Sequence, residues 1–100
     1  MEAIKTPQQC ESLEQVRAGI DRLDAQIVRL LAERGAYVLA AARFKHSADA
    51  VRAPQRVEQV VARVRALAEQ QGAMPEVVER IYRALIEAFT DAEHRHWQQR

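Results

Sequence analysis

The sequence of 100 residues is long enough for one domain with a modest hydrophobic core, and we expect a single domain over residues 1–100. Its 15 basic and 14 acidic side chains leave a formal net charge of +1, which argues against a nucleic-acid-binding protein or a protein held on an anionic membrane. No apolar run approaches the roughly 20 residues of a membrane span, and residues 1–5 lack the pattern of a signal peptide, so we expect a cytoplasmic protein.

Residues 13–45 predict one long amphipathic helix after a short arm that ends at Ser12, a suitable N-cap. The apolar residues that recur at helical spacing are Leu13, Val16, Ile20, Leu23, Ile27, Leu30, Leu31, Val38 and Ala41. At 1.5 Å per residue this helix measures roughly 50 Å, whereas a compact domain of this size has a radius of gyration near 13 Å. Since two shorter helices cannot cover it, we expect an intertwined homodimer in which a second copy covers the exposed face.

The remainder of the chain predicts two shorter helices and no strand. Residues 46–53 lack a helical apolar period and are interpreted as a loop. A proline then begins a helix over about 54–71, which Gly72 terminates, and Pro75 opens a third helix. The predicted fold class is therefore all-α, with three helices per chain and a long first helix.

A few polar residues fall on helical faces that are otherwise apolar. Arg34 stands where the spacing of the first helix calls for an apolar side chain, and Lys45 returns to nearly the same face eleven residues later. Glu93 lies four residues from both Phe89 and Trp97, where a carboxylate is partly desolvated. Such groups must either satisfy one another or bind a ligand. The candidate site residues are Arg17, Arg34, Lys45, Gln55 and Glu93.

The sequence contains none of the usual parts of covalent catalysis. There is no glycine-rich phosphate loop, and Cys10, the only cysteine, is interpreted as an inert thiol. His94 and His96 diverge on a helix because they are two residues apart, so no metal site is predicted. A pocket lined by cations and polar hydrogen-bonding groups suits a small dianion and electrostatic stabilisation, and it requires no cofactor.

Nearly the whole chain resembles the all-helical chorismate mutase family, which includes isochorismate pyruvate lyases. The segments that carry the resemblance are VRAGIDRLD (16–24), LAER (31–34) and RFK (43–45). Seventeen residues separate Arg17 from Arg34 and eleven separate Arg34 from Lys45, which reproduces the basic triad of the family.

The resemblance implies an interlaced homodimer with two sites, in which Arg17 reaches the site of the opposite subunit. It also implies an enzyme that rearranges chorismate to prephenate by positioning and charge alone. In that reaction Arg17 and Arg34 bind carboxylates of the substrate with their fork-shaped guanidinium groups. Lys45 faces the enolpyruvyl carboxylate and the ether oxygen, where negative charge grows, and its loss should raise the barrier by about 3 kcal/mol or more.

Two positions differ from the commonest family pattern. Where this chain has Glu93, the family often has a glutamine that donates to the ether oxygen, so Glu93 must be protonated to act as that donor. We therefore expect activity to fall as pH rises through the titration of Glu93, and an unchanged pH profile in a Glu93→Gln variant would contradict this. Gln55 replaces a glutamate that usually binds the substrate hydroxyl, and an amide accepts that hydrogen bond more weakly.

Other segments resemble the isochorismate pyruvate lyase branch. They are residues 5–7 with Cys10, the short segment between Lys45 and Gln55, residues 53–57, and Phe89. The same pocket promotes both pericyclic reactions, and lyases of this family can retain mutase activity. The sequence therefore supports mutase activity better than it supports one physiological substrate, and we predict a chorismate mutase of aromatic amino acid biosynthesis first. The alternative is an isochorismate pyruvate lyase, which forms salicylate and pyruvate in salicylate or siderophore biosynthesis.

Each candidate residue also has an ordinary structural interpretation. Arg34 could pair with Glu33, and Lys45 could be a solvated cation at a helix C-terminus. Glu93 could bond Arg34 or Arg95. The alternative of another class is a non-enzymatic helical interaction module, or a nucleic-acid binder that uses the arginines of residues 52–65. The acidic residues among those arginines argue against nucleic-acid binding.

Overall fold

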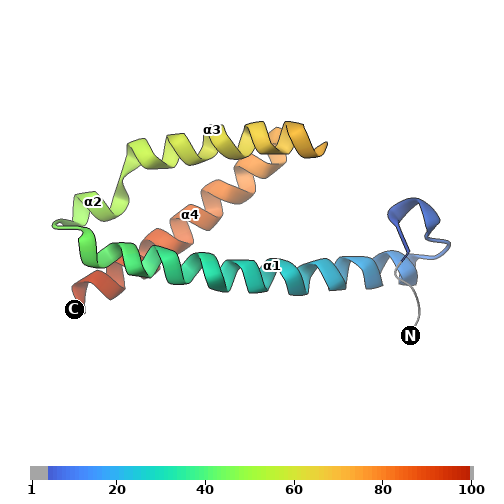
Figure 1. Cartoon of the computed structure of the whole chain (residues 1–100), viewed down its shortest axis with the longest axis horizontal. Helices are drawn as coiled ribbons and strands as arrows, with labels where there is room; N and C mark the ends of the chain where they lie inside the picture. Colours follow the sequence, from blue (N-terminus) through green and yellow to red (C-terminus); the bar gives the residue numbers. More distant parts are fainter. Residues whose placement is uncertain (1–4, 100) are drawn as a thin grey trace. The chain divides into compact units, whose positions relative to one another are not determined.

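The computed structural model describes residues 5–99, and every regular element in this part of the chain is helical (Figure 1). In chain order the elements are the 3₁₀ turn η1 (Pro7–Gln9), α1 (Leu13–Ala41), the 3₁₀ turn η2 (Ala42–Phe44), α2 (Ala48–Arg52), α3 (Pro54–Gln71) and α4 (Pro75–Gln98). The all-α prediction is confirmed, and α1 is the longest of three long helices. The first four residues of the predicted N-terminal arm lie outside the described residues.

The chain divides within α1 into two compact units, Met1–Ala36 and Tyr37–Arg100. The first unit holds η1 and most of α1, and the second holds the end of α1 and all later elements. The prediction of a single domain over the whole chain stays a prediction. None of the helices within residues 5–99 is both long enough and apolar enough to cross a membrane.

In the first unit, α1 begins where the sequence predicts. The hydroxyl of Ser12 accepts the backbone N–H of Gln15 at 3.1 Å, and the side-chain oxygen of Gln15 accepts the N–H of Glu11 at 2.7 Å. The first amides of a helix have no partner within the helix, so these bonds stabilise its start.

The apolar face of α1 in the first unit is exposed. Seven large apolar side chains of α1 in this unit have between 40% and 63% of their surface accessible to solvent, whereas Leu31 is half-buried. The seven are Leu13, Val16, Ile20, Leu23, Ile27, Val28 and Leu30. A soluble helix normally buries such a face, so this unit leaves uncovered the surface that the sequence assigns to a partner.

The other end of α1 differs from the prediction. The apolar spacing predicts a helix to Lys45, but the α-helix ends at Ala41 and η2 follows it. The N–H of Lys45 donates to the carbonyl of Ala42 at 3.2 Å, and the Lys45 backbone is extended, with φ −102° and ψ 139°. Tighter 3₁₀ turns are common at helix ends, and apolar periodicity does not distinguish them from the helix itself. Lys45 therefore lies just outside the helical segment.

The predicted loop over residues 46–53 contains a short helix, α2, which is a second correction. The hydroxyl of Ser47 accepts the N–H of Ala50 at 3.1 Å and caps the helix, and Val51 is buried. A helix of five residues is too short to show an apolar period, so the pattern could not reveal it. It ends at Ala53, which has the left-handed conformation with φ 36° and directly precedes Pro54.

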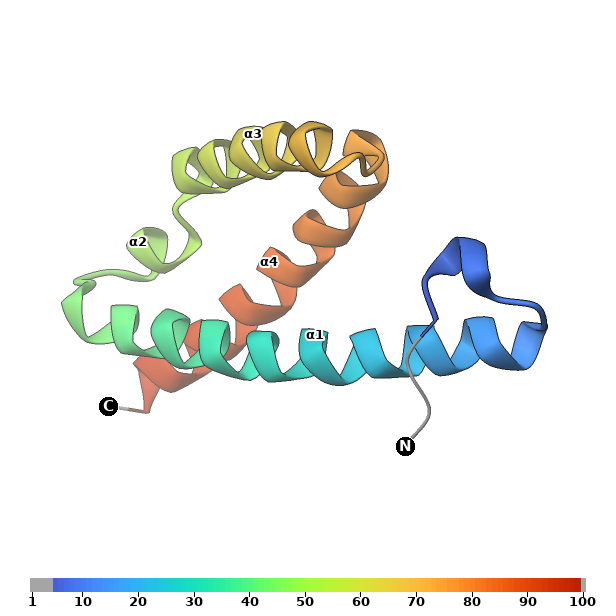
Figure 2. The ribbon, with the colours of Figure 1, turned by 45° about the vertical axis from the view of Figure 1, so that its right-hand side comes forward.

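α3 and α4 form a helical hairpin, and α3 has both of its predicted ends (Figure 2). Gly72 has φ 74°, and the N–H of Ala73 donates to the carbonyl of Ala68 at 2.8 Å, which is the hydrogen-bond pattern of a Schellman cap. Pro75 begins α4 as predicted. The hairpin thus follows from residues whose backbone preferences are strong.

Four charged side chains link α3 to α4. Arg83 on α4 donates to both carboxylate oxygens of Glu58 on α3, at 3.0 and 3.1 Å, and to Glu79 at 2.8 Å. Arg65 on α3 donates to Glu79 at 2.7 Å. The hydrogen bonds from Arg83 are the main reason why the pKa of Glu58 and that of Glu79 lie below the ordinary glutamate value.

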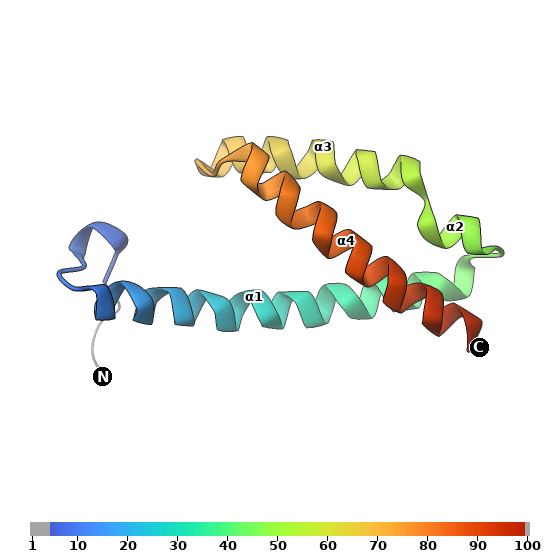
Figure 3. The same cartoon turned by 180° about the vertical axis from the view of Figure 1, so that it is seen from behind.

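α4 holds the second unit together, because it contacts α3, α2 and η2 (Figure 3). The buried apolar side chains come from those three elements: Ala42, Val51, Val60, Val61, Val64 and Ala68. The last turns of α4 reach the segment in which η2 ends, and this contact positions the candidate site.

Candidate active site

Lys45 and Glu93 form an ion pair at the junction of η2 and α4. The ammonium Nζ of Lys45 lies 2.6 Å from Oε2 of Glu93. Glu93 is 4% exposed and is the only buried charged residue among residues 5–99. The Lys45 side chain is 25% exposed. The prediction that the Glu93 carboxylate is desolvated on the inner face of its helix is confirmed.

The ion pair also argues against the interpretation of Lys45 as a solvated cation at a helix C-terminus. A solvated cation would extend into water, but the ammonium of Lys45 is directed at a buried carboxylate. A contact of 2.6 Å is at the short end for a charge-assisted hydrogen bond. An ammonium has three N–H donors, so this contact does not prevent Lys45 from donating to a bound anion as well.

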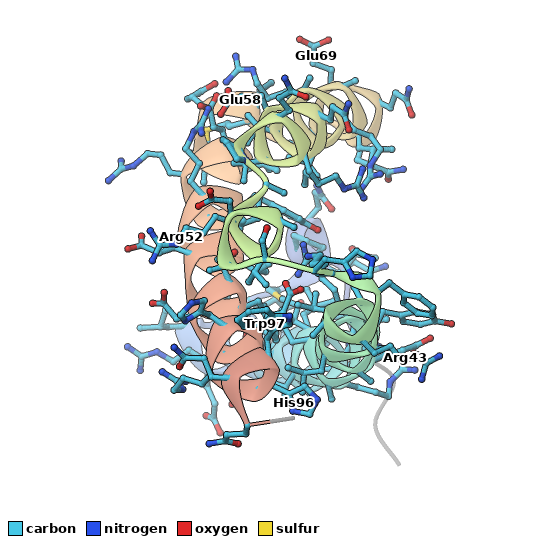
Figure 4. All side chains as sticks on the ribbon, turned by 90° about the vertical axis from the view of Figure 1, so that its left-hand side faces the viewer. Arg43, Arg52, Glu58, Glu69, His96 and Trp97 are labelled. Carbon is cyan, nitrogen blue, oxygen red and sulfur yellow. The ribbon has the colours of Figure 1, made fainter. Side chains whose placement is uncertain are left out.

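Trp97 binds the backbone of the same lysine. Its indole Nε1 donates to the carbonyl oxygen of Lys45 at 3.0 Å. Figure 4 shows the Trp97 side chain pointing from α4 toward the segment around η2. The ring of His94 stacks on that of Trp97, with ring centroids 6.4 Å apart. The sequence predicts Trp97 only as an apolar residue on the inner face, although its spacing of four residues from Glu93 already places both on one side of α4.

The other three predicted site residues are placed as follows. Arg17 is an exposed residue of α1, and Arg34 is a half-buried residue of the same helix; both belong to the first unit. Gln55 is the second residue of α3 and is exposed. The structure thus brings Lys45 and Glu93 together, whereas the convergence of the other three residues on this pair stays a prediction.

No metal site emerges from residues 5–99, where no group of three or more His, Cys, Asp or Glu side chains is arranged to hold an ion. The groups that the pair offers are an ammonium donor and a carboxyl group in partly desolvated surroundings. The ammonium of Lys45 suits recognition of an anion and stabilisation of negative charge that develops during a reaction.

Comparison with known proteins gives two matches. The model of the family "Chorismate mutase type II" matches residues 16–94, a range that contains all five predicted site residues. The isochorismate pyruvate lyase of Pseudomonas aeruginosa is 36% identical over 96 residues, which cover 96% of this chain and 95% of that protein. The similarity to the lyase therefore extends beyond the range of the family model and includes most of the N-terminal arm.

Proposed function

The chain belongs to the chorismate mutase type II family, and from this premise we propose that it rearranges chorismate to prephenate at a site built on Lys45 and Glu93. The observation that carries the proposal is the desolvated pair of these two side chains, 2.6 Å apart, inside the matched range. In such partly desolvated surroundings, a hydrogen-bond donor stabilises developing negative charge more strongly than it does in water.

The reaction suits the groups that the chain provides. It breaks an ether bond and forms a carbon–carbon bond in one step, without a covalent intermediate or a proton transfer, so the enzyme has only to position the substrate and stabilise charge. The ammonium of Lys45 would donate to the ether oxygen, on which negative charge grows as the bond lengthens. Arg17 and Arg34 would bind carboxylates of the substrate, and Gln55 would accept a hydrogen bond from its hydroxyl.

A second candidate is the isochorismate pyruvate lyase reaction, which yields salicylate and pyruvate. The near-full-length similarity to a protein of that name favours it, as do the lyase-like segments in the N-terminal arm and around Pro54. This reaction is also pericyclic and uses a substrate with the same two carboxylates, so it makes the same demands on Lys45. The two candidates differ in the substrate that the pocket prefers.

We also propose an interlaced homodimer of cytoplasmic location in which Arg17 completes the partner's site. The exposed apolar face of α1 supports this arrangement, because a second copy could bury it. The arginine lies on that same helix, so the contact that covers the helix would also carry Arg17 to the other subunit.

The test is to incubate the purified protein separately with chorismate and with isochorismate, without any cofactor, and to identify the products. Lys45→Ala should abolish turnover, and Lys5→Ala, which removes the other lysine of the chain, is the matched control. Prephenate as the main product supports the mutase, and salicylate with pyruvate, formed far more efficiently, supports the lyase. Absence of turnover with both substrates would contradict both and favour a helical interaction module.

A further inference from the structure

One face of α4 binds Lys45 at two places. Glu93 and Trp97 are four residues apart, so their side chains lie one helical turn apart on the same side of α4. Glu93 binds the ammonium of Lys45 at 2.6 Å, and Trp97 binds its backbone carbonyl at 3.0 Å. The tip and the backbone of a single lysine are therefore held by neighbouring residues of one helix.

The backbone contact matters because Lys45 lies outside the regular helices. It follows η2 in an extended conformation, and the carbonyls at a helix end have no partner within the helix. The N–H of Lys45 is bonded to Ala42, and the indole of Trp97 supplies a donor for its carbonyl. A lysine side chain has several rotatable bonds and loses conformational entropy when its ammonium is held in one place, so a fixed backbone reduces the range of positions that the ammonium samples.

We infer that Trp97 is a positioning residue for Lys45. Its indole N–H fixes the point from which the ammonium reaches Glu93 and, given the proposed function, the reacting ether oxygen. An error of about 1 Å in such a group can reduce the rate about a hundredfold. Loss of one of several contacts that hold Lys45 is a milder change, and we expect it to reduce kcat about tenfold with KM within about twofold.

The first experiment removes the indole N–H and leaves the packing in place. Trp97 is the only tryptophan, so growth with β-(3-benzothienyl)alanine, in which sulfur replaces the N–H, alters this position alone. That protein and Trp97→Phe should both show the tenfold loss of kcat. Arg83→Met, which removes the ion pairs of Arg83 with Glu58 and Glu79, controls for general destabilisation and should retain kcat.

The second experiment does not depend on activity. The chain has two lysines, the exposed Lys5 and the paired Lys45, so acetylation with limiting acetic anhydride and peptide mass spectrometry gives a ratio with an internal reference. Without the indole N–H the Lys45 segment loosens. The Lys45 to Lys5 ratio should then rise at least threefold in both Trp97 proteins and stay unchanged in Arg83→Met.

Unchanged lysine ratios in both Trp97 proteins, or kcat values that match the wild type while only the melting temperature falls, would overturn the positioning role and leave Trp97 a packing residue. If the wild type converts neither chorismate nor isochorismate, the proposed function fails instead, and the acetylation ratio still decides whether Trp97 holds Lys45.

Discussion

Replacing Lys45 by methionine removes the ammonium 2.6 Å from the Glu93 carboxylate and retains an unbranched side chain of similar length. Glu93 is only 4% exposed, so water cannot replace the lost contact. Removing one partner of a buried ion pair costs about 3–5 kcal/mol, and we take the lower end, about 3 kcal/mol, because the Lys45 side chain is 25% exposed. For a domain of this size, that loss lowers the melting temperature by roughly 12 °C or more. The matched control is Lys5→Met, which removes a lysine from the exposed N-terminal arm and should show no such loss.

A second substitution in the same protein tests whether the two side chains are coupled. Glu93→Gln in the Lys45→Met background removes the unpaired carboxylate, so the double variant should recover about 2 kcal/mol at pH 7 without recovering turnover. The assay is urea unfolding followed by circular dichroism at one fixed protein concentration, because stability depends on concentration in an oligomer. The reasoning is refuted if Lys45→Met loses less than about 0.5 kcal/mol at pH 7, or if the double variant is no more stable than Lys45→Met.

Three other features of the protein give further expected outcomes. Arg83→Met should lower the melting temperature by a few degrees near pH 7. Arg83 lowers the pKa of Glu58 and of Glu79, so its contribution is present above their ordinary value of 4.5 and is lost as pH falls through the lowered values. The difference from wild type should therefore shrink in melting curves recorded at successively lower pH below 4.5. A refolded mixture of inactive Arg17→Ala and Lys45→Ala proteins should regain about a quarter of wild-type activity, because mixed dimers hold one intact site each; a mixture that stays inactive contradicts sharing of Arg17. Ala53→Gly should raise the melting temperature slightly, because φ 36° costs an alanine about 1 kcal/mol and glycine avoids this cost. The greater entropy of glycine in the unfolded chain only partly offsets that gain, and a lower melting temperature would argue against strain at Ala53.

The helix ends that the sequence predicts correctly are those where one residue has a strong backbone preference. Ser12 begins α1, Pro54 and Gly72 bound α3, and Pro75 begins α4, because each of these residues has a strong preference at a helix end. The short elements η2 and α2 escape prediction, since neither is long enough to show a period. A prediction from apolar spacing therefore extends the first helix to Lys45, beyond its end at Ala41.

The site shows a similar division between local pattern and tertiary contact. The sequence places Lys45 and Glu93 on inner faces because each interrupts an apolar period, but it does not reveal that they bind each other. The role of Trp97 is missed because its donor acts on a backbone carbonyl 52 residues away, and no spacing rule describes such a contact. The family resemblance adds the expected substrate-binding roles of Arg17 and Arg34, and the role of Arg17 depends on a partner subunit.

The two halves of α4 carry different tasks, and this separation can be tested. The ion pair of Arg83 with Glu58 joins α4 to α3, whereas Glu93 lies ten residues later, roughly 15 Å farther along the helix, where α4 meets Lys45. Effects of substitutions more than about 10 Å apart without shared partners usually add. Arg83→Met should therefore lower the melting temperature and leave kcat within about twofold of wild type, whereas Trp97→Phe should reduce kcat about tenfold. A large loss of kcat in Arg83→Met, measured well below its melting temperature, would show that the hairpin contacts also set the geometry of the Lys45 site.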